Sequence, residues 1–167
     1  MMRRIFFLFI LIFVSSLSFA RDEQTVDAVI VLGNLAVVAH VGDSRAYLVN
    51  DEIKAVTKDH SFVQLLIDTG KITELEAAFH PDRNIITRAV GIEHVVDVEI
   101  DIVDINEGDK LLICTDGLNG YVSDAYILKI IKEYGDSSTE KLVETANNSG
   151  GRDNVTVVII SDSVQGE

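Results

Sequence analysis

The chain has 167 residues, which is enough for one domain with a sizeable hydrophobic core. It contains 27 acidic residues against 14 Lys and Arg, which gives a net charge of −13 at pH 7. This acidic balance argues against nucleic acid or an anionic membrane surface as a partner, because both need clustered Lys and Arg. The single cysteine, Cys114, excludes an internal disulfide bond. We expect it to be a small core residue, because it lies inside a predicted buried strand.

The first 20 residues have the composition of a secretory leader. Arg3 and Arg4 precede ten apolar residues at 5–14, and a run rich in small residues follows and ends at Ala20. The apolar run is short for a membrane span, which needs about 20 residues. We therefore expect residues 1–20 to be a signal peptide or, if uncleaved, an N-terminal anchor that contacts the membrane through residues 5–20. The protein is then exported or membrane-anchored, or cytoplasmic if the leader is an artefact of a gene fragment.

The next part of the chain predicts strands followed by two short helices. Strands are expected at 25–32, 35–41, 45–49 and 53–56, with a hairpin turn at Gly33-Asn34, and we interpret them as an antiparallel meander. Helical spacing begins near Ser61 and ends at Gly70. A second short helix is predicted to start at a capping box formed by Thr73 and Glu76.

The rest of the chain alternates strands and helices. Alternation at 96–102 predicts a half-buried strand with Asp97, Glu99 and Asp101 facing solvent. A helix is predicted between Ser123 and Gly135, because Ile127, Ile130, Ile131 and Tyr134 share one face. A further helix is expected to begin at a capping box of Ser137 and Glu140 and to turn Leu142, Val143 and Ala146 to the core. Buried strands are predicted at 110–114 and 155–160.

Three of the predicted strand ends each carry an aspartate next to or near a glycine. Asp43 follows the strand at 35–41, Asp116 follows the strand at 110–114, and Asp153 precedes the last strand. Mg²⁺ and Mn²⁺ prefer carboxylate and water oxygens as ligands. The pattern therefore predicts a shared site for a divalent cation.

Two other site chemistries fit the sequence less well. The four histidines have no close pairs and no cysteine partners, which disfavours a zinc site. His60 follows Asp59, with which it could form a hydrogen-bonded structural pair. Ser44 follows Gly42-Asp43 in a motif that resembles that of serine hydrolases, but no Asp-x-x-His pair downstream supplies the base that such an enzyme needs.

Five motifs, in the same order, resemble those of the bacterial PPM-type (PP2C-like) metal-dependent protein serine/threonine phosphatases, and the likeness covers about residues 25–160. It implies an α+β fold, a partial α-β-β-α sandwich of two antiparallel sheets flanked by helices. The motifs are Val41-Gly42-Asp43-Ser44-Arg45-Ala46-Tyr47, Thr57-Lys58-Asp59-His60-Ser61, Ile86-Thr87-Arg88-Ala89-Val90-Gly91, Cys114-Thr115-Asp116-Gly117-Leu118 and Gly151-Arg152-Asp153-Asn154.

The resemblance also implies a reaction and a site. Such enzymes hydrolyse phosphoserine and phosphothreonine in proteins, the products of serine/threonine kinase pathways, with a water activated by two Mg²⁺ or Mn²⁺ ions. No catalytic residue beyond the metal ligands is predicted, and the substrate-binding residues are unknown. Arg45 is expected to brace the fold, and residues 60–88 correspond to a mobile flap. By position, Asp116 and Asp153 match metal ligands, Asp43 matches a ligand of an additional metal, and Asn154 and Gly117 support the site.

The chain departs from the family pattern at two places. Gly120 stands where relatives often have another acid, which weakens the case for the additional metal. The initial strands with a phosphate-binding Arg and a metal-bridging Asp-Gly have no counterpart, so we expect residues 21–167 to be an incomplete, N-terminally truncated phosphatase domain with reduced activity. The alternatives are a non-catalytic exported module that binds metal or a phosphoprotein, and an inactive gene fragment.

Overall fold

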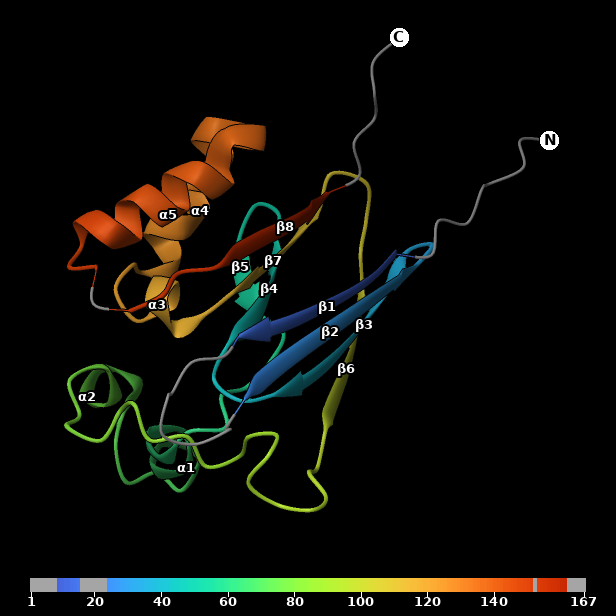
Figure 1. The fold of residues 1–167 in the computed structure, drawn as a ribbon. Helices are drawn as coiled ribbons and strands as arrows, with labels where there is room; N and C mark the ends of the chain where they lie inside the picture. Colours follow the sequence, from blue (N-terminus) through green and yellow to red (C-terminus); the bar gives the residue numbers. More distant parts are fainter. Residues whose placement is uncertain (1–8, 16–23, 152, 162–167) are drawn as a thin grey trace, which may run out of the picture.

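Two antiparallel four-stranded sheets pack face to face in the computed structural model, which describes residues 9–15, 24–151 and 153–161 (Figure 1). Sheet 1 has the strand order β1 (Phe9–Ser15), β2 (Thr25–Leu32), β3 (Leu35–Val41), β6 (Glu99–Asp104). Sheet 2 has the order β5 (Ile53–Ala55), β4 (Arg45–Val49), β7 (Lys110–Cys114), β8 (Val157–Ser161). The helices are α1 (Phe62–Asp68), α2 (Glu74–Ala78), α3 (Asp116–Asn119), α4 (Asp124–Tyr134) and α5 (Ser138–Asn148). The prediction of two antiparallel sheets flanked by helices is confirmed.

The strands do not form the predicted meander, because the chain changes sheets after β3. β3 pairs with β2 and β6, whereas β4 pairs with β5 and β7. The crossing takes place at Gly42, whose φ of 127° lies in a region that favours glycine. A Cβ atom on Gly42 would lie 2.3 Å from the Cγ2 atom of Thr25, so this position has no room for a side chain. The meander prediction was wrong because strand spacing alone does not show which sheet a strand joins.

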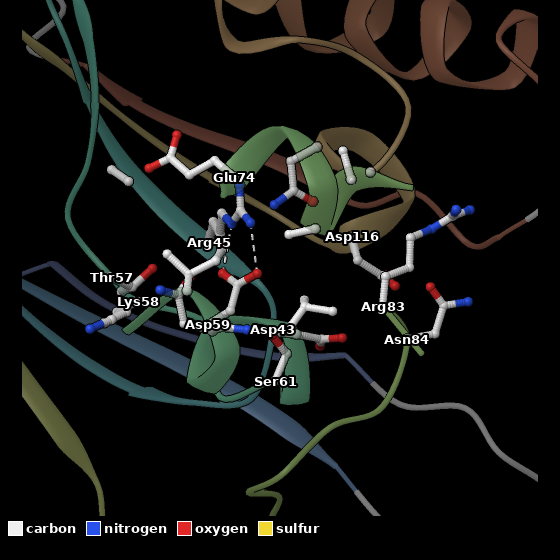
Figure 2. A pocket seen from close by; sticks show the side chains of 18 of the residues that line it. Asp43, Arg45, Thr57, Lys58, Asp59, Ser61, Glu74, Arg83, Asn84 and Asp116 are labelled. Atoms are coloured by element: carbon white, nitrogen blue, oxygen red, sulfur yellow. Dashed lines mark hydrogen bonds and ion pairs between the residues drawn. The ribbon is translucent and has the colours of Figure 1, made fainter. Parts of the chain in front are cut away.

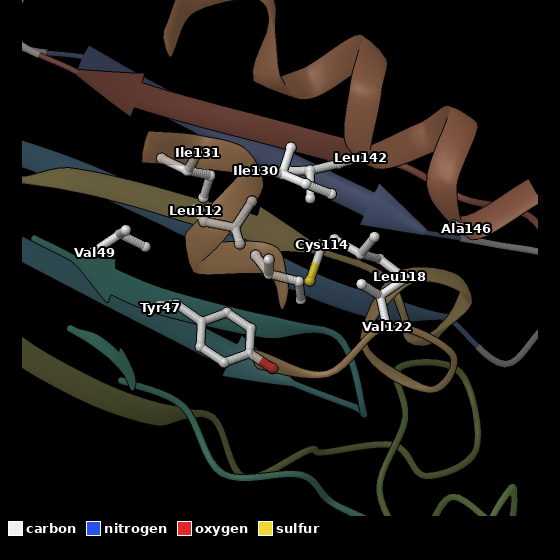
Figure 3. Packing of buried hydrophobic residues seen from close by; sticks show 11 residues of the cluster. Tyr47, Val49, Leu112, Cys114, Leu118, Val122, Ile130, Ile131, Leu142 and Ala146 are labelled. Carbon is white, nitrogen blue, oxygen red and sulfur yellow. The ribbon is translucent and has the colours of Figure 1, made fainter. Parts of the chain in front are cut away.

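One hydrophobic cluster joins sheet 2 to the C-terminal helices (Figure 3). Cys114 is fully buried in it, as predicted, and Ile127, Ile130 and Ile131 are the buried residues of α4. Each fully buried Leu or Ile side chain contributes about 1.5–3 kcal/mol relative to an exposed one. A second cluster lies between the sheets and contains Val29, Ala36, Val38, Ala46, Leu111 and Ile113. The loops at the strand ends, where the site is predicted, are therefore supported by two sheets with a packed hydrophobic core.

The predicted helix starts are confirmed for the two short helices but not for α5. Ser61 caps α1 by accepting a hydrogen bond from Gln64, and the capping box of Thr73 and Glu76 is present at α2. The capping box at Ser137 was wrong. A 3₁₀ turn at Gly135–Ser137 leads directly into α5, so the backbone of Ser137 is not extended and its side chain forms no capping bond.

The alternation in β6 has the predicted period, but its faces are reversed. Ile100 and Ile102 are 62% and 67% exposed, whereas Glu99 pairs with the buried His40 of β3 and turns toward the interior. The solvent-facing prediction was therefore wrong for Glu99 and for Asp101, which pairs with the buried Val38. The reason is that the helical layer of α4 and α5 covers sheet 2, and among the described residues no helix covers the outer face of sheet 1.

Part of the predicted leader forms a strand. β1 pairs antiparallel with β2 over seven residues, from Phe9 opposite Val31 to Ser15 opposite Thr25. The other leader residues, 1–8 and 16–20, lie outside the described residues, and the signal peptide or anchor stays a prediction. In the described part of the chain, no helix has the length and apolar character needed to cross a membrane.

Candidate metal-binding site

The three predicted aspartates lie around one cavity of about 450 Å³ at an end of the sandwich (Figure 2). Asp43 is on the crossing from β3 to β4, Asp116 begins α3, and Asp153 precedes β8. Segments that are more than 30 residues apart in the sequence thus contribute carboxylates to one space. Their role as metal ligands stays a prediction.

Burial and nearby negative charges raise the pKa of two of the carboxyl groups, those of Asp43 and Asp116. The pKa of Asp43 is raised to about 7, mainly by burial and then by the negative charges of Asp116 and Asp59. The pKa of Asp116 is raised by burial and then by the charge of Asp153. A divalent cation would offset this repulsion, and carboxylate oxygens are the donors that Mg²⁺ and Mn²⁺ prefer. The chemistry of the donor set therefore fits such a cation.

The number of donors is smaller than a closed metal site requires. Within the ranges that the structure describes, no three His, Cys, Asp or Glu side chains converge closely enough to hold a metal ion. Mg²⁺ usually keeps several water ligands and takes only one or two carboxylates from the protein. In the described part of the chain, the three aspartates therefore line the cavity without forming a closed metal-binding cluster.

Thr115 and Gly117 fasten the corner that carries Asp116 to the loop that carries Asp153. Thr115 Oγ1 donates to the carbonyl oxygen of Asn154 at 3.1 Å and accepts from the backbone N–H of Thr156 at 3.1 Å. A Cβ atom on Gly117 would lie 2.4 Å from the same Asn154 oxygen. Gly117 and Asn154 thus support the site through backbone contact. Asp116 begins the short helix α3 directly after β7.

Arg45 braces the cavity wall, as the resemblance implies. Its Nε and Nη2 atoms donate to Oδ1 and Oδ2 of Asp59 at 2.6 and 2.7 Å. Asp59 therefore pairs with Arg45 and not with His60, so the predicted Asp59–His60 pair was wrong. The alternation of residues in β4 places Arg45 beside the cavity, but no local pattern links it to Asp59 fourteen positions later.

Two cations, Lys58 just before the predicted flap and Arg83 within it, also line the cavity, and the sequence reasoning missed both. Lys58, Arg83 and Asn84 line its wall. In Figure 2, Lys58 is on the side of Thr57 and Asp59, whereas Arg83 and Asn84 are on the side of Asp116. Lys58 forms an ion pair with Asp68 of α1 at 2.7 Å. Arginine and lysine attract phosphate oxygens, so the cavity offers both carboxylates for a cation and cations for a phosphate group.

Ser44 does not take part in this cavity as a nucleophile would. It is 1% exposed, and its Oγ atom lies 3.4 Å from Oγ1 of Thr25. The residues that line the cavity include its neighbours Asp43 and Arg45 but not Ser44. The geometry gives the serine-hydrolase interpretation no support.

Known proteins with a similar sequence and fold are protein phosphatases. The chain is 43% identical over 138 residues to the serine/threonine protein phosphatase PstP of Mycobacterium tuberculosis. The match covers 81% of this chain and 26% of PstP. The crystal structure of the serine/threonine phosphatase Stp1 of Staphylococcus aureus has a TM-score of 0.81 at 38% identity and matches 84% of this chain and 57% of Stp1. No protein-family model matches the chain.

A solved relative contains the expected metal. The catalytic domain of PstP in complex with two manganese ions is 40% identical, with a TM-score of 0.73, and the match covers 82% of this chain and 57% of that domain. The present chain thus spans a little over half of the solved domains that it matches. By sequence and by fold, it belongs to the family of PPM-type (PP2C-like) protein serine/threonine phosphatases.

Proposed function

We propose that this chain takes part in the metal-dependent hydrolysis of phosphoserine or phosphothreonine in proteins. The observation that carries the proposal is the meeting of Asp43, Asp116 and Asp153 around one cavity, where burial and mutual repulsion raise the pKa of the first two. The relatives with this fold are serine/threonine phosphatases, one of them solved with two manganese ions. The proposed substrates are phosphoproteins made by serine/threonine kinases.

In this proposal, the three aspartates hold Mg²⁺ or Mn²⁺ and the flap holds the phosphorylated side chain. A bound divalent cation lowers the pKa of water and offsets negative charge on phosphoryl oxygens. Lys58 and Arg83 attract the phosphate group, and the ion pair of Arg45 with Asp59 keeps the cavity wall in place. Asn154 and Gly117 keep the Asp153 loop against the start of α3.

Phosphate release from a phosphothreonine peptide tests this function. The full chain with millimolar Mn²⁺ is expected to release phosphate faster than the Asp116→Asn variant, and EDTA is expected to abolish the difference. Asp116→Asn keeps the size of the side chain and removes its negative charge. Equal release by the two proteins would contradict the catalytic proposal and leave metal or phosphoprotein binding without catalysis.

We propose that the leader directs the chain to export or anchors it to a membrane. The support for this is the order of Arg3 and Arg4, the apolar run at 5–14 and the small residues up to Ala20. Mass spectrometry of the protein recovered from its native cells measures the N-terminus. A mature protein that begins at Arg21 supports export with cleavage, and one that retains residues 1–20 in the membrane fraction supports an anchor. A protein that retains residues 1–20 in the soluble cytoplasmic fraction contradicts the proposal.

A further inference from the structure

His60, the first residue of the predicted flap, is bonded twice to the glycine that precedes Asp43. The backbone N–H of His60 donates to the carbonyl oxygen of Gly42 at 2.7 Å. In the opposite direction, the backbone N–H of Gly42 donates to Nδ1 of the His60 ring at 3.0 Å. Both residues are buried. The backbone bond holds the carbonyl group of the Gly42–Asp43 peptide, and the ring bond holds the N–H group of the Val41–Gly42 peptide. His60 therefore binds the peptide groups on both sides of Gly42, and the second of these carries Asp43.

The crossing at Gly42 needs such a contact. Its φ of 127° is available to glycine, and glycine is the residue with the greatest conformational freedom in the chain. The turn also joins the two sheets, since β3 ends at Val41 and β4 begins at Arg45. Without hydrogen bonds from outside the turn, the direction of the Asp43 side chain would depend on the flexible backbone at Gly42.

The bond from Gly42 selects one form of the His60 ring. Because Nδ1 accepts a hydrogen bond, the neutral ring carries its proton on Nε2. That N–H points to Glu99 Oε2 of β6 at 3.0 Å. Arg88 Nη1 lies 2.9 Å from the same nitrogen, but a guanidinium only donates, so this contact is not a hydrogen bond when Nε2 carries the proton. Burial lowers the pKa of His60 and the nearby charges of His40 and Arg88 add to this, although the hydrogen bond to Glu99 acts in the opposite direction. The neutral ring that the Gly42 bond requires is thus favoured.

The plane of the ring is held from its other side by a second histidine. His40 of β3 stacks on His60 with the ring centroids 4.7 Å apart and the planes at 26°. His40 is itself held by Asp27 of β2, whose Oδ1 lies 2.7 Å from His40 Nδ1, and both side chains are fully buried. Side chains of three strands of sheet 1 therefore determine where the His60 ring lies.

We propose that His60 is a positioning residue that holds Gly42 by the peptide groups on both of its sides, so that the carboxylate of the following Asp43 faces the cavity. The inference rests on the proposed role of Asp43 as a metal ligand. His60 does not line the cavity, and it acts on the site only through Gly42. His60 thus joins the start of the flap to one wall of the site.

Two conservative variants of the full chain separate this role from a general structural one. In His60→Asn, Oδ1 occupies the place of Nδ1 and still accepts from Gly42, but the bond to Glu99 is lost. In His60→Gln, the side chain reaches Glu99 but offers no acceptor at the Nδ1 position. The backbone bond from His60 to Gly42 remains in both variants, and both lose the stacking on His40.

Two readouts are expected to distinguish the variants. In His60→Gln, amide hydrogen exchange at Gly42, measured by NMR, is expected to accelerate about tenfold or more. Mn²⁺ binding, measured by calorimetry, is expected to weaken about fivefold to tenfold, the effect of losing one buried hydrogen bond. His60→Asn is expected to restore both quantities to within about twofold of the original chain, although both variants lose thermal stability.

Other outcomes would overturn the proposal. Faster exchange at Gly42 with unchanged Mn²⁺ affinity makes His60 a purely structural residue. Equal Mn²⁺ affinities in the two variants, weakened in line with their stability, also contradict it. If the original chain binds no Mn²⁺, the proposed function fails. The ¹³C shift of the Asp43 carboxyl then decides the inference, since a positioning role requires that His60→Gln, and not His60→Asn, changes it.

Discussion

Arg45 and Asp59 form a two-pronged ion pair, with N–O distances of 2.6 and 2.7 Å, at the wall of the cavity that contains Asp43. The Asp59 side chain is 13% exposed and that of Arg45 is 33% exposed, so solvent screens the pair only in part. Arg45 also lies 3.4 Å from the hydroxyl of the buried Tyr47. The pair thus ties the crossing between the sheets to the segment that leads into the flap.

Breaking this pair is expected to destabilise the fold. Asp59→Asn leaves the guanidinium of Arg45 without a charged partner and is expected to lower the free energy of unfolding by about 2 kcal/mol. Urea unfolding followed by circular dichroism measures the change. Lys141→Met, which breaks the exposed pair of Lys141 with Glu144, serves as the control and should leave the unfolding midpoint unchanged. An equal effect of the two substitutions would contradict a bracing role.

The raised pKa of Asp43 predicts how stability depends on pH without metal. The pKa is about 7 in the folded chain, against 3.8 for the unperturbed group, so between these values the folded state binds more protons than the unfolded state. The Asp43 contribution to stability therefore falls as pH rises from about 4 to 7 and stays low above 7. Asp43→Asn is expected to stabilise the metal-free chain at pH 8 by about 1–3 kcal/mol. Thermal unfolding of the variant and of the original chain in EDTA, at pH 5 and at pH 8, measures this. If the stability difference between the two proteins is the same at both pH values, the raised pKa of Asp43 is contradicted.

The same proton competes with a cation at the site. Mn²⁺ binding to the full chain is expected to weaken as pH falls below about 7, because Asp43 must lose its proton to coordinate a metal ion. Isothermal titration calorimetry in buffers of different ionisation enthalpy measures both the affinity and the proton released. Proton release that is absent at pH 6 would show that Asp43 is not a ligand.

Gly117 is expected to tolerate no side chain. In Gly117→Ala, the new Cβ would lie 2.4 Å from the carbonyl oxygen of Asn154, so the loop with Asp153 must move away from α3. We expect about 1–3 kcal/mol of destabilisation and weaker Mn²⁺ binding. Thr115→Ser is the matched control at the same corner, because it keeps the hydroxyl that binds Asn154. Unfolding and calorimetry on the two variants decide the matter, and an Ala variant as stable as the control would show that the contact is dispensable.

The outward position of Ile100 can be tested against an inward neighbour on the paired strand. Ile100→Lys is expected to change the free energy of unfolding by about 0.5 kcal/mol or less, because the side chain is 62% exposed. Val38→Lys, which places a charge in the fully buried space between the sheets, is expected to prevent folding. Circular dichroism and urea unfolding compare the two. A strongly destabilised Ile100→Lys would mean that this face is covered in solution.

Local patterns predicted the elements whose bonds lie within a few residues. The strands β2 and β3, the hairpin at Gly33-Asn34 and the capping box at Thr73 all depend on neighbours in the sequence, and the structure has them where they were expected. The helix that contains Ile127 could also be predicted from the sequence, because its apolar positions follow the helical period. These features are determined by local backbone chemistry.

Contacts between residues that are far apart in the sequence could not be predicted from local patterns. The face that β6 turns inward depends on its pairing with β3, and the partner of His60 is Glu99, 39 positions later. The bond of Thr115 to the Asn154 loop and the positions of Lys58 and Arg83 at the cavity likewise depend on how the sheets and loops pack. At the site, the sequence located the three aspartates through their glycine-flanked strand ends, but it could not show what holds them in place.

Because of the crossing at Gly42, the separation of the three aspartates depends on how the two sheets pack against each other. Asp43 belongs to the connection between sheet 1 and sheet 2, whereas Asp116 and Asp153 are attached only to strands of sheet 2. Any sliding of one layer over the other would change the separation of Asp43 from the other two carboxylates before it changed any hydrogen-bonded strand pair. Affinity for a cation that bridges them would then vary with inter-sheet geometry, so mutations in the distant cluster around Val38 and Leu111 are predicted to alter ion binding without touching the cavity.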